Sequence, residues 1–143
     1  MIDSQLIFSN AQDIAGTSET ITGTNIVDLG SLVNHKGDAL SGVVNVTGAM
    51  ALNIVVTTAL AGNTAVVTFK LFDHSTTTPS NGRQLITFAV TLGASGYPAG
   101  TQICSIPLPA MELGRYLGFY VQIATASLTG NVTAWIGPVH QQP

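Results

Sequence analysis

The stretch TAVVTFKLFD, residues 64–73, decides the fold class of this chain. Val67, Phe69 and Leu71 stand at every second position, so they share one face of an extended chain. Thr68 and Lys70 lie between them and fall on the opposite face. β-branched and aromatic residues, which favour strands, dominate the stretch. It therefore predicts a β-strand with one buried face.

The same alternation recurs along the chain. Similar stretches fall at residues 4–8, 25–29, 41–47, 51–58, 84–92, 101–106, 116–125 and 131–136. Turn-forming sequences separate them, including Ala61-Gly62-Asn63 between two of the clearest stretches and Asn81-Gly82 in a polar loop. No stretch of useful length has a helical period. We predict an all-β fold, a jelly-roll-like antiparallel β-sandwich of about eight or nine strands.

The chain has the size of one domain. It holds 143 residues without a break in composition, so residues 1–143 are expected to form a single sandwich. The predicted core residues are Val67, Phe69, Phe88, Leu117, Phe119 and Val121. Residues 1–24 hold few large apolar side chains, and we predict an extended N-terminal arm there. Leu6 and Phe8 are expected to dock as an edge strand, on their own sandwich or on a neighbouring subunit.

Charge is unusually scarce in this sequence. Charged residues make up 8% of the chain, hydrophobic residues 45%, and the mean hydropathy is +0.41. The usual charged share is about 25%. Depletion of charge is typical of the centre of an interface, so we predict a homo-oligomer, a dimer or a trimer.

The composition also bears on the chain's partners. Four basic residues cannot form the cationic patch that nucleic acids require, and no stretch reaches the roughly 20 apolar residues that span a membrane. We expect neither a nucleic acid nor a membrane as partner. The single Cys104 excludes an internal disulfide and is expected to fill space in a strand. The first residues lack the pattern of a signal peptide, so we expect an intracellular product.

No motif for catalysis stands out. The seven carboxylates have no paired spacing, whereas general acid–base chemistry needs two groups brought together. His35 and His74 could serve a small jelly-roll metal enzyme, but neither has a second ligand at close spacing. We expect no enzyme activity, no metal, no cofactor and no small-molecule substrate.

The alternative from the binding class is a receptor- or carbohydrate-binding sandwich that uses exposed rings of Trp135, Tyr97 or Tyr120. The alternation around Trp135 favours burial of its ring in the core or in an interface.

Four stretches of the sequence resemble stretches of a known protein family. MIDSQLIFSNAQ at residues 1–12, NIVDLG at 25–30, IPLP at 106–109 and GRYL at 114–117 resemble capsid cement (decoration) proteins of tailed bacteriophages. The order and length of the segments resemble that family over most of the chain.

This resemblance implies a structural role. Members of the family are jelly-roll proteins on the outside of an icosahedral head; they associate as oligomers, clamp neighbouring coat subunits and have no catalytic residues. The resemblance therefore implies a virion protein on the capsid exterior, made in the host cytoplasm, with the major capsid protein and further copies of itself as partners. The candidate interface residues are Leu6, Phe8, Tyr97 and Tyr120.

Overall fold

The structure is an all-β sandwich, as the sequence predicts. The computed structural model describes residues 6–29, 50–78, 81–109, 111 and 113–138. The strands are β1 (Ile7–Asp13), β2 (Thr20–Thr22), β3 (Val27–Asp28), β4 (Met50–Ala61), β5 (Val66–His74), β6 (Arg83–Thr91), β7 (Gln102–Pro107), β8 (Tyr116–Ala124) and β9 (Thr129–Pro138). Within the described ranges there is no α-helix, and so none long and apolar enough to cross a membrane.

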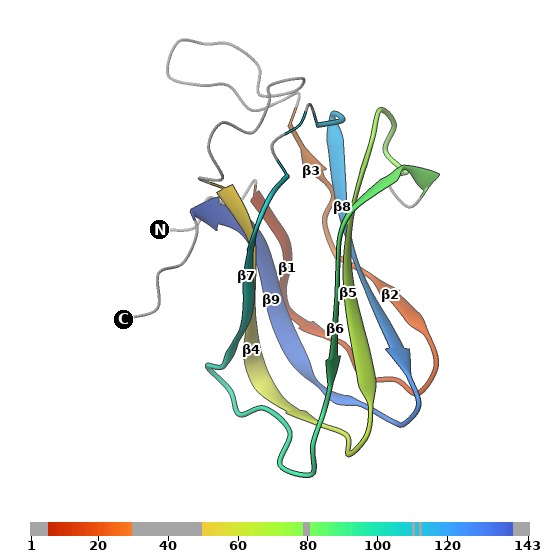
Figure 1. Ribbon diagram of the computed structural model, residues 1–143, viewed down its shortest axis with the longest axis vertical. Helices are drawn as coiled ribbons and strands as arrows, with labels where there is room; N and C mark the ends of the chain where they lie inside the picture. Colours follow the sequence, from red (N-terminus) through yellow and green to blue (C-terminus); the bar gives the residue numbers. More distant parts are fainter. Residues whose placement is uncertain (1–5, 30–49, 79–80, 110, 112, 139–143) are drawn as a thin grey trace.

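Two antiparallel sheets form the layers of the sandwich (Figure 1). One sheet has four strands in the order β1-β9-β4-β7. The other has five strands: β2-β8-β5-β6, with the short β3 also paired to β8. The two sheets face each other and enclose the core between them.

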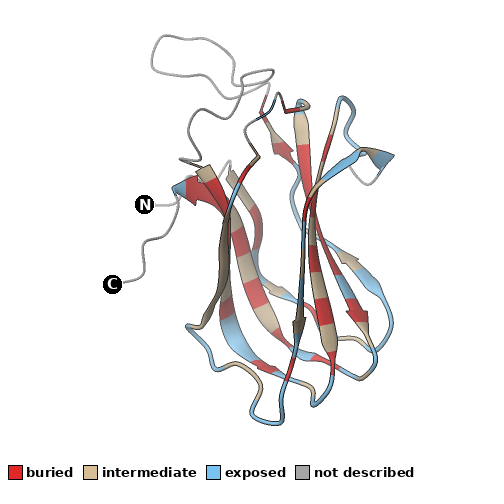
Figure 2. Cartoon of the chain, viewed as in Figure 1, coloured by how far each residue is buried: buried red, intermediate tan, exposed pale blue. Residues whose placement is uncertain are grey.

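Strand β5 shows why the sequence folds in this way. Its burial alternates at every position, and Val67, Phe69 and Leu71 are buried while the residues between them are half-exposed (Figure 2). Burying one face of a strand against a second sheet imposes this period of two. The neighbouring β8 aligns Val121 with Phe69 and Phe119 with Leu71, so the buried faces of both strands coincide.

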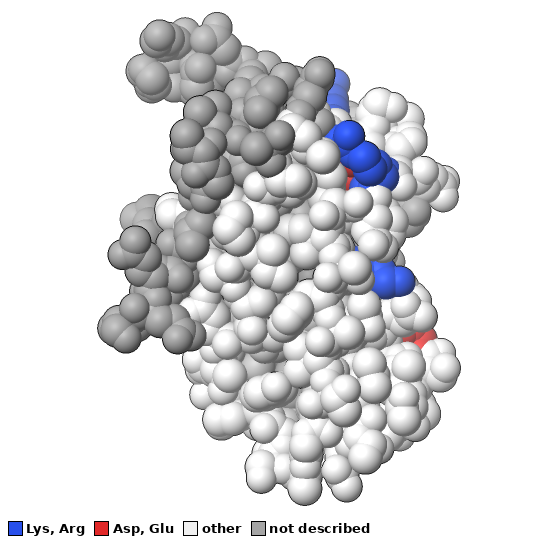
Figure 3. Space-filling model, in the orientation of Figure 1, with Lys and Arg blue, Asp and Glu red and all other residues white. Residues whose placement is uncertain are grey.

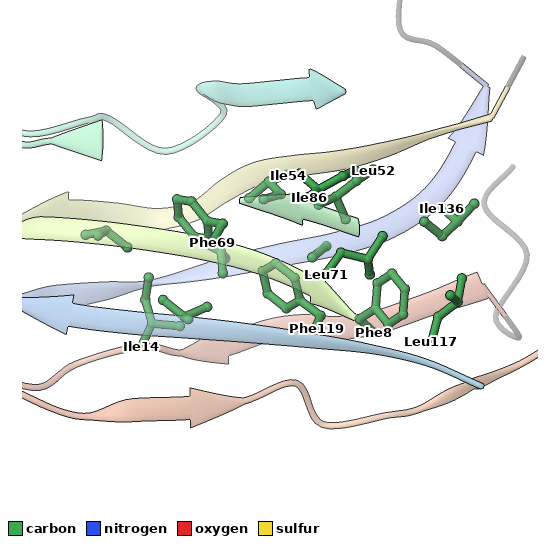
Figure 4. Close-up of a cluster of buried hydrophobic side chains, with 14 of the residues drawn as sticks. Phe8, Ile14, Leu52, Ile54, Phe69, Leu71, Ile86, Leu117, Phe119 and Ile136 are labelled. Atoms are coloured by element: carbon green, nitrogen blue, oxygen red, sulfur yellow. The ribbon is translucent and has the colours of Figure 1, made fainter. Parts of the chain in front are cut away.

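Three aromatic rings occupy the middle of the core (Figure 4). The ring of Phe119 stacks on Phe8 from β1, with centroids 6.0 Å apart, and on Phe69 from β5, at 6.1 Å. Phe8 belongs to the four-stranded sheet and the other two rings to the five-stranded sheet. This stack therefore ties the two layers together.

The predicted core is largely confirmed. Five of its members are buried: Val67, Phe69, Leu117, Phe119 and Val121. Phe88 is only half-buried, because it lies on β6 at the edge of its sheet, where no described strand covers its open side.

The N-terminal segment differs from the prediction. β1 covers residues 7–13 instead of 4–8 and pairs with β9, and β2, which was not predicted, pairs with β8. The described part of the predicted arm is thus built into the sandwich of its own subunit. Residues 1–5, and the strand predicted at 41–47, lie outside the described residues.

Candidate functional site

Two of the stretches that carry the family resemblance meet at one end of the five-stranded sheet. β3 pairs antiparallel with the start of β8, which places Asp28 opposite Tyr116. The Leu29 N–H donates a hydrogen bond to the Arg115 carbonyl, 2.7 Å away. We call this region, comprising β3, the start of β8 and the ends of β5 and β6 beside it, the β3–β8 end.

A two-bond ion pair joins the same stretches through their side chains. Nε and Nη2 of Arg115 donate to Oδ1 and Oδ2 of Asp28 at 2.8 and 3.0 Å. The guanidinium also lies over the Tyr116 ring, 5.0 Å from its centroid. The hydrogen bonds and charge of Asp28 raise the pKa of Arg115 above its ordinary value. Because water screens this exposed pair, it adds little stability, and its main effect is to hold the Arg115 side chain in place.

The beginning of the chain reaches the same region. The Asn25 N–H donates to the Phe8 carbonyl at 2.8 Å, and the Asn25 side-chain amide donates to the Ile7 carbonyl at 3.3 Å. Hydrogen bonds therefore connect residues from three of the stretches that resemble cement proteins, those at 1–12, 25–30 and 114–117, although these stretches are far apart in the sequence.

A second ion pair lies beside the first, where β5 ends and β6 begins. Asp73 is 4% exposed and accepts hydrogen bonds from Nε and Nη2 of Arg83, at 3.1 and 2.6 Å. The Gly114 N–H, just before β8, donates to the same carboxylate at 2.7 Å. A side chain at Gly114 would meet the His74 backbone at 2.9 Å, so the close approach of the two segments favours glycine. Asp73 thus fastens the segment before β8 to the β5–β6 hairpin.

A shallow cavity of about 470 Å³ opens at this end, lined by Asp73, His74, Ser75, Arg83, Leu113 and Gly114. His74 Nδ1 accepts a hydrogen bond from the Thr76 N–H at 3.0 Å and lies 2.8 Å from Thr76 Oγ1. That nitrogen is therefore engaged within its own loop. Among the described residues, no three His, Cys, Asp or Glu side chains converge as metal ligands would. His35, the other histidine of the alternative metal-enzyme hypothesis, lies outside these residues.

The four candidate interface residues do not lie together. Phe8 is fully buried in the core of its own subunit, which is the first of the two dockings expected for it. Leu6 is half-buried against the same core. Tyr97 lies in the loop between β6 and β7, where its N–H and carbonyl both bond to Leu60.

Tyr120 is the fourth candidate and lies on the outer face of the five-stranded sheet. Its side chain is largely covered, and Phe72 meets its ring edge-on, with centroids 5.4 Å apart. The Tyr120 ring is therefore not available as a flat surface on which a sugar could stack.

Trp135 and Asn53 lie opposite each other on the outer face of the four-stranded sheet, a placement that the sequence analysis did not predict. The register aligns Ile7, Trp135, Asn53 and Ser105 in one row across the outer face of the four-stranded sheet. Trp135 is thus half-exposed on the outside rather than in the core, and its indole lies over Gly137, where a Cβ atom would be 3.0 Å from the ring. The predicted burial in the core is wrong, because Val132, Ala134 and Ile136 fill the inner face of β9.

Asn53 is buried although it faces outward. Its side-chain amide donates to the carbonyls of Ala51 and Pro138 at 3.2 and 3.3 Å, and its carbonyl accepts from the Ser105 hydroxyl at 2.7 Å. These bonds satisfy the buried amide and tie β4 to β7 and β9. The signal in the sequence was a single asparagine inside an apolar strand.

The half-buried Cys104 thiol offers a simple test of how β7 packs on the core. Burial raises the pKa of this thiol from 9.0 to about 12. At pH 8 the thiolate is then roughly a thousandfold scarcer than in the unfolded chain, so disulfide reagents should modify the folded protein far more slowly than the protein in guanidinium. Because the unfolded chain loses its proton first, stability should also fall as the pH rises above about 9. Equal labelling rates for both states would contradict this placement.

Comparison with known proteins identifies the family of this chain. No curated protein matches the chain. A family model described as Bbp16 matches residues 8–136, which reach from the start of β1 nearly to the end of β9. The chain therefore belongs to the Bbp16 family.

Proposed function

We propose that this chain is a capsid cement protein. In this role it binds the outside of an icosahedral phage head as a homo-dimer or trimer and stabilises contacts between major capsid protein subunits. It acts by binding alone, without catalysis and without a cofactor. The observation that supports this role best is the cluster at the β3–β8 end, where three stretches that resemble cement proteins are bonded to one another.

The character of the surface agrees with this role. Figure 3 shows that few charged side chains lie on the described surface in that view, and that most of it is uncharged. A protein that binds only the assembled shell stabilises it by mass action, and the contributions of many copies add up over one head. A sandwich with so few charged residues suits such a static contact, since interface centres are depleted in charge.

We further propose that the β3–β8 end faces the coat. Ile26, which directly precedes β3, is 41% exposed, and Met111, in the segment leading to β8, is 36% exposed. These are the exposed large hydrophobic side chains of the described residues. Both lie in segments that adjoin this end, where Asp28 binds the Arg115 side chain through two hydrogen bonds. Apolar anchors beside a positioned arginine are the usual composition of an interface centre.

The test uses heads from which this protein has been removed. Purified protein should sediment with the heads but not with free coat subunits, raise the temperature at which the heads break open, and add density to the outer surface. Ile26→Asp should weaken binding at least about tenfold, since a buried interface would then hold an unpaired charge. The control, Ala59→Asp, changes an exposed residue of β4 at the other end of the sandwich and should bind normally. Failure to bind heads would refute the function, whereas equal binding by both variants would refute only the chosen surface.

The alternative, a receptor- or carbohydrate-binding module, has one residue in its favour. Trp135 is half-exposed on the outer face of the four-stranded sheet and is the single tryptophan of the chain, so its fluorescence reports on that face. Saturable quenching by a glycan, lost in Trp135→Ala, together with density at a tail tip instead of the head, would favour this alternative over cementing.

A further inference from the structure

The edges of the two sheets differ in how they are protected against pairing. β1 has two register shifts and a left-handed residue, Ala11, with φ of 49°. β2 and β3 hold only three and two residues, and β7 holds six and ends at Pro107. Short strands, bulges and proline are the devices by which edges avoid pairing with another chain.

β6 lacks most of these devices. It is nine residues long, contains no proline, and carries one charge, on its first residue Arg83. The register shift opposite it lies between Leu71 and Phe72, near the beginning of the strand. Among the described strands its only neighbour is β5, so one row of backbone N–H and carbonyl groups faces away from the sheet. A long edge with a single charge at one end is a template for a further strand.

The side chains of β6 are also incompletely covered. Phe88 and Val90 point toward the core, opposite Phe69 and Val67 of β5, yet both are half-exposed. Leu85 packs against the core and is half-exposed as well. A strand added beside β6 would cover these side chains and bond the open backbone groups at the same time.

We propose that the added strand is β6 of a second copy, paired antiparallel about a two-fold axis at Phe88. This arrangement places Ile86 opposite Val90 of the second copy on the core side and Thr87 opposite its Ala89 on the outer side. Arg83 lies beyond the paired centre, so no two like charges meet there. The strand is thus complementary to itself, as an isologous interface requires, and two five-stranded sheets become one continuous sheet.

This inference rests on the self-association part of the proposed function and needs no capsid for its test. Sedimentation equilibrium of the full chain at micromolar concentrations should show a dimer. Ala89→Lys places two ammonium groups near the two-fold axis and should raise the dimer Kd at least about tenfold. Ala59→Lys makes the same exchange at an exposed position near the end of β4, in the other sheet and away from β6, and should leave the Kd unchanged.

A cross-link tests the register directly. In the double variant Thr87→Cys/Ala89→Cys, the two new thiols lie on one face of one strand and too far apart to join each other, but each faces its counterpart in the second copy. Mild oxidation should give a covalent dimer, while a variant with the same pair at Thr57 and Ala59 should not. A monomeric wild type, a trimer, or a dimer that Ala89→Lys leaves intact would overturn the proposal. Head binding by a protein that is monomeric would overturn this interface and leave the cement role standing.

Discussion

Replacing Phe119 with alanine is expected to lower the free energy of unfolding by about 3–5 kcal/mol. Its ring is buried on β8 and contacts Phe8 and Phe69 at the centre of the core. The truncation removes both stacking contacts and leaves a cavity between two sheets that cannot close without moving whole strands. Since domains of this kind are stable by about 5–15 kcal/mol, the loss is a large share of the total.

The control for this variant is Phe72→Ala, the same truncation on the neighbouring strand β5. Phe72 lies on the outer face, half-exposed, and its ring meets Tyr120 edge-on. Its loss should cost less than half as much, because little cavity forms at a surface that water can reach. Urea denaturation of both variants, followed by circular dichroism, gives the comparison. A Phe119→Ala loss no larger than that of Phe72→Ala would mean that the stack is not the centre of the core.

Alternation of side chains explains which strands the sequence could predict. β5 buries one face against the opposite sheet, so its apolar residues repeat with period two and mark the strand. β8 keeps the same period on its inner face, from Leu117 to Ile123, although Gly118 and Tyr120 on its other face are buried as well. β2 carries no such signal: Thr20 and Thr22 are exposed, and the strand exists because its backbone pairs with β8. Pairing between backbones leaves no trace in the side chains, which is why β2 was missed.

The same limit applies to the candidate site. Asp28 and Arg115 are 87 positions apart, so no local pattern links them, and only the pairing of β3 with β8 brings them together. The resemblance to cement proteins includes both stretches but did not predict that their side chains form an ion pair. The interpretation of Trp135 was wrong for a different reason. Trp135 shares its face of β9 with the polar Asn131 and Thr133, and the opposite face is the apolar one that fills the core. The alternation therefore places the indole on the outer face, and the expectation of core burial did not follow it.

Asp73→Ala is expected to lower the free energy of unfolding by about 2–4 kcal/mol. The carboxylate is buried and accepts hydrogen bonds from Arg83 and from the Gly114 N–H. Arg83 is 52% exposed and regains water when its partner is removed, so the loss arises mainly at Gly114 and in the space that the carboxylate vacates. The segment before β8 then loses its attachment to β5.

The chain provides its own control in Asp28→Ala, which removes the other two-bond aspartate–arginine pair. Both pairs have the same chemistry, and they differ in exposure: the Asp28 side chain is 29% exposed and that of Asp73 is 4% exposed. Water and salt screen an exposed pair, so Asp28→Ala should cost much less, and its small effect should shrink further in 1 M salt. The Asp73→Ala loss should persist in salt, because the carboxylate and the backbone N–H that it binds are shielded from solvent ions. Equal losses in urea denaturation, or a Asp73→Ala effect that salt abolishes, would show that burial does not set the strength of these pairs and that Asp73 does not fasten the segment before β8.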